Sequence, residues 1–125
     1  MLINHVGRRT GHLHTAVVEV VDHDPDADTW TVASGFGPSA DWYRNLLATP
    51  DVTIQIGRRT IPVTARALSD DEGADAMAGY AAAHPRTARR IARFMGFEVD
   101  GTERDYREVG RAVPFVRFAP RPAVT

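Results

Sequence analysis

The feature of this 125-residue sequence that most constrains its fold is a pair of alternating segments joined by a short polar turn. Val52, Ile54 and Ile56 alternate with polar residues, and a second alternation follows over residues 61–67, after a turn at residues 57–59. Because successive side chains of a strand point to opposite faces, each segment predicts a strand with one buried face. The glycine-containing turn predicts that the two strands form an antiparallel hairpin.

Turn residues and helix caps mark the other elements. Ser39 is a good N-cap, Ser69 and Glu72 form a capping box, and Gly96 is typical of a helix end. In chain order the predicted elements are strand 12–22, strand 29–34, helix 39–49, strand 52–56, strand 61–67, helix 69–80, helix 85–95, helix 102–109 and strand 114–119. Local hairpins dominate and no regular strand–helix–strand alternation recurs. We therefore expect an α+β fold that is mainly β, a small antiparallel barrel with helices packed outside it.

Composition excludes several classes of function. The length and a hydrophobic content of 43% predict one globular domain over residues 1–125, with a loose tail over residues 120–125. Fifteen basic and sixteen acidic residues nearly cancel, so there is no global electrostatic case for a nucleic-acid partner. The absence of cysteine excludes thiol catalysis and cysteine-ligated metal, and all basic residues are arginine, which excludes a Schiff-base lysine. No apolar run approaches the roughly 20 residues of a membrane span, so the expected location is the cytoplasm.

Two glycines flank a compact basic segment, Gly7-Arg8-Arg9-Thr10-Gly11, directly before the first predicted strand. Glycines allow backbone amides to approach an anion, and arginine forks match phosphate oxygens in pairs. The segment is not a Walker motif, which needs a longer loop and a lysine. It is either a binding turn for a phosphorylated cofactor or a simple exposed basic turn.

A second glycine-rich segment, residues 33–37, leads into the predicted helix that carries Trp42. Such a strand-to-helix junction offers free amides and the positive end of a helix dipole, which attract anions. Trp42 and Phe36 could add a flat surface for an aromatic cofactor. The alternative is a tight turn with a core tryptophan. The third glycine and the acidic residue of the dinucleotide fingerprint are missing.

The histidines and serines do not indicate metal or hydrolytic chemistry. His12 and His14 lie two residues apart, so they share a face of the predicted strand, but no third ligand follows at a matching spacing. No Gly-x-Ser-x-Gly elbow is present, which argues against a serine hydrolase. We expect no metal site.

Arginine and tyrosine side chains leave two questions open. Four arginines between residues 86 and 93 fall on one helical face, which is either a solvated face or a surface for an acidic partner. Tyr43, Tyr80 and Tyr106 are typical core or boundary residues, yet one of them could donate a proton in a pocket. The sequence does not choose among the three.

In combination, these segments resemble the deazaflavin-dependent nitroreductase family. That family couples a Gly-Arg-Lys/Arg-Ser/Thr-Gly turn to a strand, a glycine-rich loop and a Trp-Tyr-x-Asn-Leu helix. The corresponding segments here are residues 7–11, 33–37 and 42–46, with further likeness over residues 50–57 and 63–66. The likeness runs in order over residues 7–120.

The resemblance implies a split β-barrel of the FMN-binding kind that binds the deazaflavin coenzyme F-420, a hydride carrier with a phosphodiester and an oligoglutamate tail. Relatives, mainly actinobacterial, reduce quinones, nitroaromatics and similar activated acceptors. The expected function is hydride transfer from C5 of the reduced coenzyme to such a small-molecule acceptor. A homodimer and peripheral membrane contact are further expectations.

The resemblance also assigns residues. The first turn would hold the phosphate and tail, the amides of the loop would complete the cradle, and a wall of side chains would lie along the ring. These residues are Arg8, Arg9, Thr10 and His14 for the phosphate and tail; Ala33, Ser34, Gly35, Phe36 and Gly37 for the loop; and Val17, Trp42 and Asn45 for the wall. Tyr106 is nominated as the proton donor.

Two features depart from the family pattern. His14 stands where many members have arginine, so that contact would be weaker and dependent on pH. The sequence begins almost at the first motif, whereas members commonly carry a helix and a longer strand before it, so a more open acceptor pocket is expected. Two alternatives remain: an FMN-dependent oxidoreductase with the FMN phosphate at Arg8 and Arg9, and a non-catalytic deazaflavin carrier.

Overall fold

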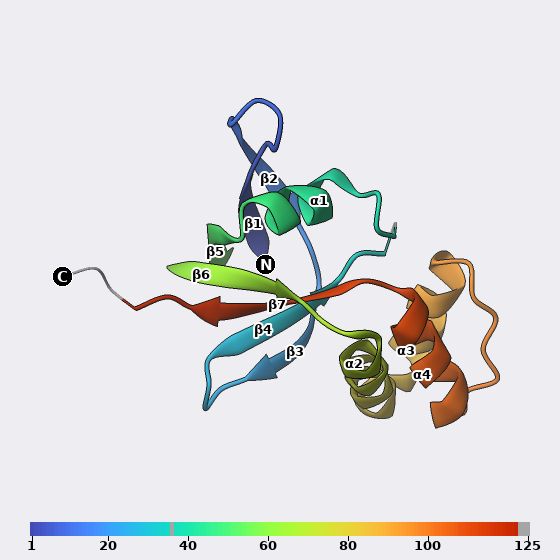
Figure 1. Cartoon of the computed structure of the whole chain (residues 1–125). Coiled ribbons are helices and arrows are strands. Elements are labelled where there is room, and N and C mark those ends of the chain that lie inside the picture. The colour runs from blue at the N-terminus through green and yellow to red at the C-terminus, as the bar shows by residue number, and fades with distance from the viewer. Residues whose placement is uncertain (36, 123–125) are drawn as a thin grey trace.

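The computed structural model describes residues 1–35 and 37–122. Within this part of the chain, strands form one antiparallel sheet and helices pack around it (Figure 1). The strands are β1 (Leu2–Val6), β2 (Leu13–Val17), β3 (Val20–Asp24), β4 (Thr29–Ala33), β5 (Asp51–Ile56), β6 (Arg59–Ala67) and β7 (Phe115–Pro120). The helices are α1 (Asp41–Ala48), α2 (Asp70–Ala83), α3 (Pro85–Phe94) and α4 (Glu103–Ala112).

The sheet curls into a half-barrel whose two edge strands are not paired with each other. Its strands follow the order β2-β1-β5-β6-β7-β4-β3, so β2 and β3 are the two edges. Only Val18 and Glu19 separate those edges along the chain, and such a connection spans at most about 10 Å. The edges must therefore approach each other at this point, which curls the sheet. The expected hairpins β3–β4 and β5–β6 both form, and the antiparallel barrel with helices outside it is confirmed.

The single strand expected over residues 12–22 was wrong, because the run forms two strands on opposite edges. Its first half pairs with β1, a strand that the sequence patterns did not predict. That pairing extends to Val18, whose N–H donates to the Met1 carbonyl at 3.0 Å and whose carbonyl accepts from the Met1 ammonium at 3.1 Å. Beyond Val18 the run leaves β1 and pairs with β4 as β3. A valine-rich run favours extended backbone throughout and does not mark the residue at which the partner changes.

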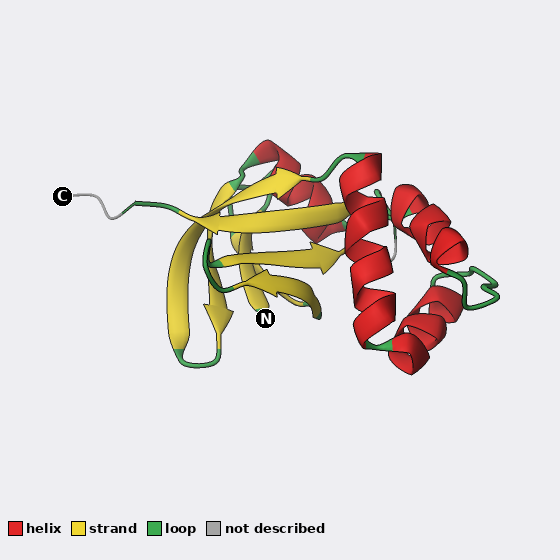
Figure 2. Cartoon of the chain, turned by 90° about the horizontal axis from the view of Figure 1, so that it is seen from below, coloured by secondary structure: helices red, strands yellow, loops and turns green. Residues whose placement is uncertain are grey.

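Two apolar clusters hold the fold together. The first fills the barrel and includes Ile3, Trp30, Ile54, Val63 and Phe118, all at most 2% exposed. The second lies among α2, α3 and α4, which gather at one end of the sheet (Figure 2). The helix α1 instead contacts β1 and β6. No helix in the described part of the chain is long and apolar enough to cross a membrane.

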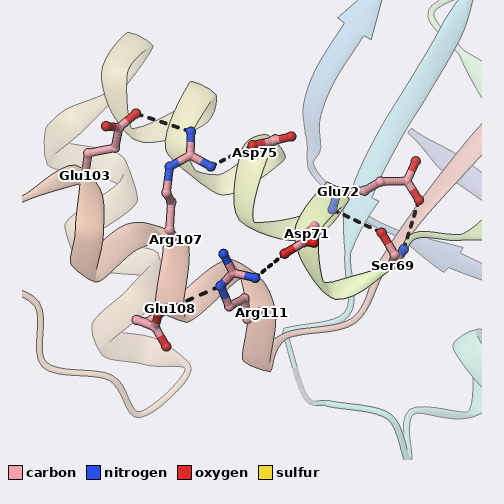
Figure 3. A network of polar contacts seen from close by, with 8 residues as sticks. All are labelled: Ser69, Asp71, Glu72, Asp75, Glu103, Arg107, Glu108 and Arg111. Atoms are coloured by element: carbon pink, nitrogen blue, oxygen red, sulfur yellow. Dashed lines mark hydrogen bonds and ion pairs between the residues drawn. The ribbon is translucent and has the colours of Figure 1, made fainter.

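The helices α2 and α4 touch backbone to backbone through two glycines. A Cβ added to Gly73 would collide with the carbonyl oxygen of Gly110, and a Cβ on Gly110 would collide with the carbonyl oxygen of Gly73. Salt bridges flank this contact between Arg107 and Asp75, Arg107 and Glu103, and Arg111 and Asp71 (Figure 3). Small residues therefore set how closely these two helices approach.

Most predicted helix caps form, with one correction. Ser69 Oγ accepts from the Glu72 N–H, and the Glu72 carboxylate accepts from the Ser69 N–H, which completes the capping box (Figure 3). Gly96, expected at the end of a helix, follows α3 with a φ of 92°, and Pro85 begins that helix, but α2 and α4 run further than predicted. Ser39 is not an N-cap, because α1 begins at Asp41 and Ala40 takes the cap position. Of the expected loose tail, residues 123–125 lie outside the described residues.

Candidate functional site

The first glycine-flanked segment forms the tight turn between β1 and β2, residues 7–12, at the top of Figure 1. The Gly11 N–H donates to the Gly7 carbonyl at 2.8 Å, and the Gly7 N–H donates to the His12 carbonyl at 2.8 Å. Gly11 has a φ of 72°, a left-handed conformation that favours glycine. A Cβ on Gly7 would meet Thr10 Oγ1. The glycines therefore shape the turn and bring its basic residues together.

A cavity of about 350 Å³ lies beside this turn. It is lined by His5, Gly7, Arg8, Arg9, Thr10, His14, Thr15, Asp41 and Asn45. The side chains of Arg9 and Thr10 are exposed at its rim, and Arg9 has no ion pair with any described residue. Arg9 is thus the cation of the β1–β2 turn that remains available to an external anion.

Arg8 is held inside the protein instead. Its N–H and its Nη1 both donate to Asn45 Oδ1, at 3.1 and 2.8 Å, and its Nη2 donates to Asp41 Oδ1 at 3.2 Å. The Arg8 side chain is only 19% exposed. Asn45 in turn bonds through Nδ2 to His5 Nδ1 at 2.9 Å. Arg8 and Asn45 were each expected to contact the coenzyme. In the structure they bond to each other and so fasten the β1–β2 turn to α1.

His5 is a site residue that sequence reasoning missed. It lies opposite His14 across the β1–β2 pair, with ring centroids 5.6 Å apart in a stacked arrangement. Burial, followed by repulsion from His14, lowers the pKa of His5, which favours the neutral imidazole. The signal was hidden because no strand was predicted over residues 2–6, so the cross-strand partner of His14 could not be identified.

Some amides of the glycine-rich loop after β4, which was expected to form an anion cradle, already bond within the protein. The Ser34 N–H donates to the Pro114 carbonyl at 2.8 Å, and the Gly37 N–H donates to the Ser34 carbonyl at 3.0 Å. The Ser34 hydroxyl also donates to the Gly37 carbonyl at 2.6 Å. Two of the loop amides are therefore used within the protein, which corrects the prediction for them. Phe36 lies outside the described residues.

The loop also opens toward the helices and not toward the β1–β2 turn. Gly35 and Gly37 line a cavity with Phe94, Met95 and Phe97 at the end of α3. Ala33, at the end of β4, packs against the helical cluster. The structure thus places the two glycine-rich segments at separate cavities.

The remaining predicted residues fall in three places. Trp42 is half-buried on α1, packed against the barrel core and edge-on to Tyr43. Val17 is 81% exposed at the end of β2. Tyr106 is 3% exposed in the helical cluster, where it lines a cavity of about 400 Å³ between α2, α3 and α4. The structure does not bring Tyr106 to the cavity at the β1–β2 turn.

The residues at the turn suit a phosphorylated coenzyme. An unpaired arginine, a threonine hydroxyl and the exposed His14 present hydrogen-bond donors to one cavity, the donor set that phosphate and carboxylate groups require. The described residues contain no group of three or more side chains able to hold a metal ion. The chemistry of this site therefore points to an organic anion.

Comparisons with known proteins give a family and a fold for this chain. A family model described as F420H(2)-dependent quinone reductase matches residues 1–95, which include the β1–β2 turn, the barrel strands β1–β6 and α1. A solved structure of an F420-H2 dependent reductase (FDR-A) is 21% identical, with a TM-score of 0.63, over 94% of this chain and 90% of that chain. Another, described as a domain-swapped dimer, is 21% identical, with a TM-score of 0.62, over 94% of this chain and 77% of that chain. These likenesses show the fold.

A search of curated proteins found no match. The family model is decisive because it covers most of the chain and every segment of the first cavity. The chain therefore belongs to the F420H(2)-dependent quinone reductase family, as an oxidoreductase whose cofactor is coenzyme F-420.

Proposed function

We propose that this protein reduces a quinone with reduced coenzyme F-420, whose anionic end is held at the β1–β2 turn. The bound coenzyme supplies a hydride, so reduction of a quinone to a hydroquinone needs that hydride and one proton. The observation that carries the proposal is the unpaired Arg9 beside Thr10 and His14, within the segment that matches the family model. A quinone is favoured over a nitroaromatic acceptor because the matching family is described by its quinone reductase activity.

The roles of the chain's own residues follow from their contacts. Arg9, Thr10 and His14 face the cavity and would hold phosphate and carboxylate oxygens. Arg8 would act through Asn45 by fixing the turn against α1, since its guanidinium already bonds to Asn45 and Asp41. Val17 and Trp42 would lie along the ring.

Binding of the coenzyme tests this proposal directly. We expect oxidised F-420 to bind in preference to FMN, as followed by ligand fluorescence polarisation. Arg9→Ala should weaken F-420 binding by about 5- to 150-fold, the range of about 1–3 kcal/mol expected for charged hydrogen bonds. Arg58→Ala is the matched control, because Arg58 is an exposed arginine in the other hairpin turn, between β5 and β6. Equal binding of FMN, or equal effects of the two substitutions, would contradict the proposal.

The acceptor is identified by turnover. We expect the protein loaded with reduced F-420 to reduce 2-methyl-1,4-naphthoquinone faster than nitrobenzene at equal concentrations. Faster reduction of the nitro compound would move the assignment to nitroreductase activity. Binding without turnover of either compound would favour a carrier.

We further propose a homodimer. The relative described as a domain-swapped dimer has the same fold, and β2 leaves one edge of this sheet open with Leu13 75% exposed. Open edges and exposed apolar side chains favour pairing with another chain. Light scattering coupled to gel filtration should therefore give twice the mass of the 13.7 kDa chain. A monomer mass at micromolar concentration would refute this.

A further inference from the structure

Another cavity, of about 680 Å³, lies between β3 and α2. These two elements pack against each other beside the end of the barrel (Figure 1). Residues 20–23 line one side of it, and Gly79, Tyr80 and His84 line the other. Neither the β1–β2 turn nor the glycine-rich loop contributes to it. The sequence patterns assigned no role to this cavity.

Tyr80 anchors the wall of this cavity. It is 6% exposed, and its hydroxyl donates to Glu19 Oε1 at 3.0 Å. Glu19 belongs to the two-residue connection between β2 and β3. The Tyr80 ring also lies against the His84 imidazole, with 5.2 Å between ring centroids. These two contacts of Tyr80 bring together three segments of the chain: the β2–β3 connection, α2 and the α2–α3 junction.

The charges around these residues come from every side of the cavity. The other titratable or charged residues that line it are Asp22, His23, Glu72, Asp75 and Arg117, and Arg90 of α3 acts electrostatically on Tyr80. Burial, followed by the hydrogen bond to Glu19, raises the pKa of Tyr80 to about 12. The Tyr80 hydroxyl therefore keeps its proton at neutral pH and is a poor acid.

His84 is the better proton donor of the pair. Its side chain is exposed at the cavity, and its backbone caps the end of α2 and the start of α3. Histidine is the residue type that takes up and releases protons near neutral pH, which general acid catalysis requires. The Tyr80 ring, held by the hydrogen bond to Glu19, lies against the imidazole.

The position of the cavity connects it to the proposed function, on which this inference rests. An anionic tail held at the β1–β2 turn leaves the rest of the coenzyme to run along β2, whose five residues span about 16 Å. The exposed side chains of Thr15, which lines the first cavity, and Val17 share one face of β2 along that path, and Glu19 comes two residues later. The reactive end of an extended coenzyme would then reach the β2–β3 connection, beside Tyr80 and His84.

We propose that His84 supplies the proton of the reaction, with Tyr80 and Glu19 as its positioning residues. The acceptor gains a hydride from the reduced coenzyme, an N–H bond of the His84 imidazolium breaks, and an O–H bond forms on the acceptor oxygen. The quinone thereby gains two electrons and two hydrogens, and the imidazole regains its proton from water. The Tyr80 hydroxyl remains protonated throughout.

The proposed position of the bound coenzyme beside His84 can be tested without turnover. Oxidised F-420 is added to protein labelled with ¹³C in its histidines, and the Cε1–H resonances are followed by NMR. We expect the His84 resonance to shift through the ring current of the coenzyme, while the resonance of His12, next to the start of β2 and outside this cavity, shifts less. Binding by polarisation without a shift at His84 would overturn this inference and leave the proposed function intact, whereas absence of binding would overturn the proposed function.

The chemistry is tested with variants of the loaded enzyme. His84→Gln should retain F-420 affinity within about twofold but lower kcat by 10² or more, as expected for loss of a general acid. We expect kcat of the parent to fall at high pH and this fall to be absent in His84→Gln, and added imidazole should restore part of the rate. Glu98→Gln is the control, because Glu98 is exposed and lies outside this cavity, and it should retain kcat within about twofold. Unchanged kcat in His84→Gln, or a rate loss without rescue by imidazole and with an unaltered pH profile, would overturn the proposal.

The positioning role of Tyr80 has its own readout. Tyr80→Phe keeps the ring against His84 but loses the bond to Glu19, so it should lower kcat less than His84→Gln does, with KM unchanged. Glu19→Gln leaves Tyr80 a hydrogen-bonding partner, so this variant should keep most of the kcat of the parent. If Tyr80→Phe weakened coenzyme binding and left kcat unchanged, Tyr80 would be a binding residue and the positioning role would be refuted.

Discussion

At the residue scale, Asn45 is the centre of the first cavity. Its Oδ1 accepts two hydrogen bonds from Arg8, and its Nδ2 bonds to His5. The side chain is 4% exposed. If it were removed, each of its partners would lose a hydrogen bond that water replaces poorly. The residue that the family resemblance places at the coenzyme wall thus also holds the turn to α1.

Asn45→Ala should therefore destabilise the protein as well as weaken coenzyme binding. We expect a loss of about 1–3 kcal/mol in the free energy of unfolding for each buried group left without a partner, as measured by urea denaturation. Arg44→Ala is the control, because Arg44 is exposed on the same helix and has no ion pair with a described residue. Equal stabilities of the two variants would show that the hydrogen bonds of Asn45 contribute little.

At the element scale, the contact between α2 and α4 depends on the absence of side chains. Gly73 and Gly110 each face the other's carbonyl oxygen, and neither position has room for a methyl group. Neither glycine has the positive φ that would demand glycine for conformational reasons. The requirement therefore lies in packing between helices, and a methyl group would force the helices apart.

Gly110→Ala should lower the free energy of unfolding by about 1–3 kcal/mol, the usual cost of overpacking. Gly79→Ala provides a contrast within α2, because a Cβ there meets no atom within 4 Å. The higher helix propensity of alanine should then stabilise the protein by up to about 1 kcal/mol. Thermal unfolding monitored by circular dichroism should show opposite shifts, and equal shifts would contradict the packing argument.

At the scale of the whole molecule, Glu72 joins the helices to the barrel. From α2, its carboxylate accepts two hydrogen bonds from Arg66 of β6, each 2.9 Å long, and lies 3.8 Å from Arg117 of β7. It also closes the capping box with the Ser69 N–H. The bonds from Arg66, followed by the bond from the Ser69 backbone, lower the pKa of Glu72 to about 2. One side chain therefore links a helix end to two strands.

The low pKa of Glu72 predicts a pH dependence. Because the carboxylate is favoured in the folded state, its stabilising effect is complete above its ordinary pKa of 4.5 and is lost as the pH falls toward about 2. The difference in Tm between the parent and Glu72→Gln should thus shrink over that range. Glu98→Gln is the control, since Glu98 has no ion pair with a described residue. A difference in Tm that stayed constant from pH 7 to pH 2 would rule out this linkage.

Local patterns predicted those elements whose signals lie close together in the chain. The alternation over residues 52–67 predicted the β5–β6 hairpin because its two strands are adjacent. The capping box of Ser69 and Glu72 predicted the start of α2 for the same reason. The strand β1 was missed because its neighbours, β2 and β5, are recognised only once the sheet is assembled.

The sequence by itself determined the antiparallel character of the sheet, the capping box of α2 and, through the family resemblance, the cofactor of the enzyme. The tertiary structure decided which of these residues meet. It joined Arg8 to Asn45, used the amides of Ser34 and Gly37 within the loop, and placed Tyr80 beside Glu19 across 61 residues of chain. Periodicity and capping act over a few residues, whereas contacts between distant segments depend on the order and curvature of the whole sheet.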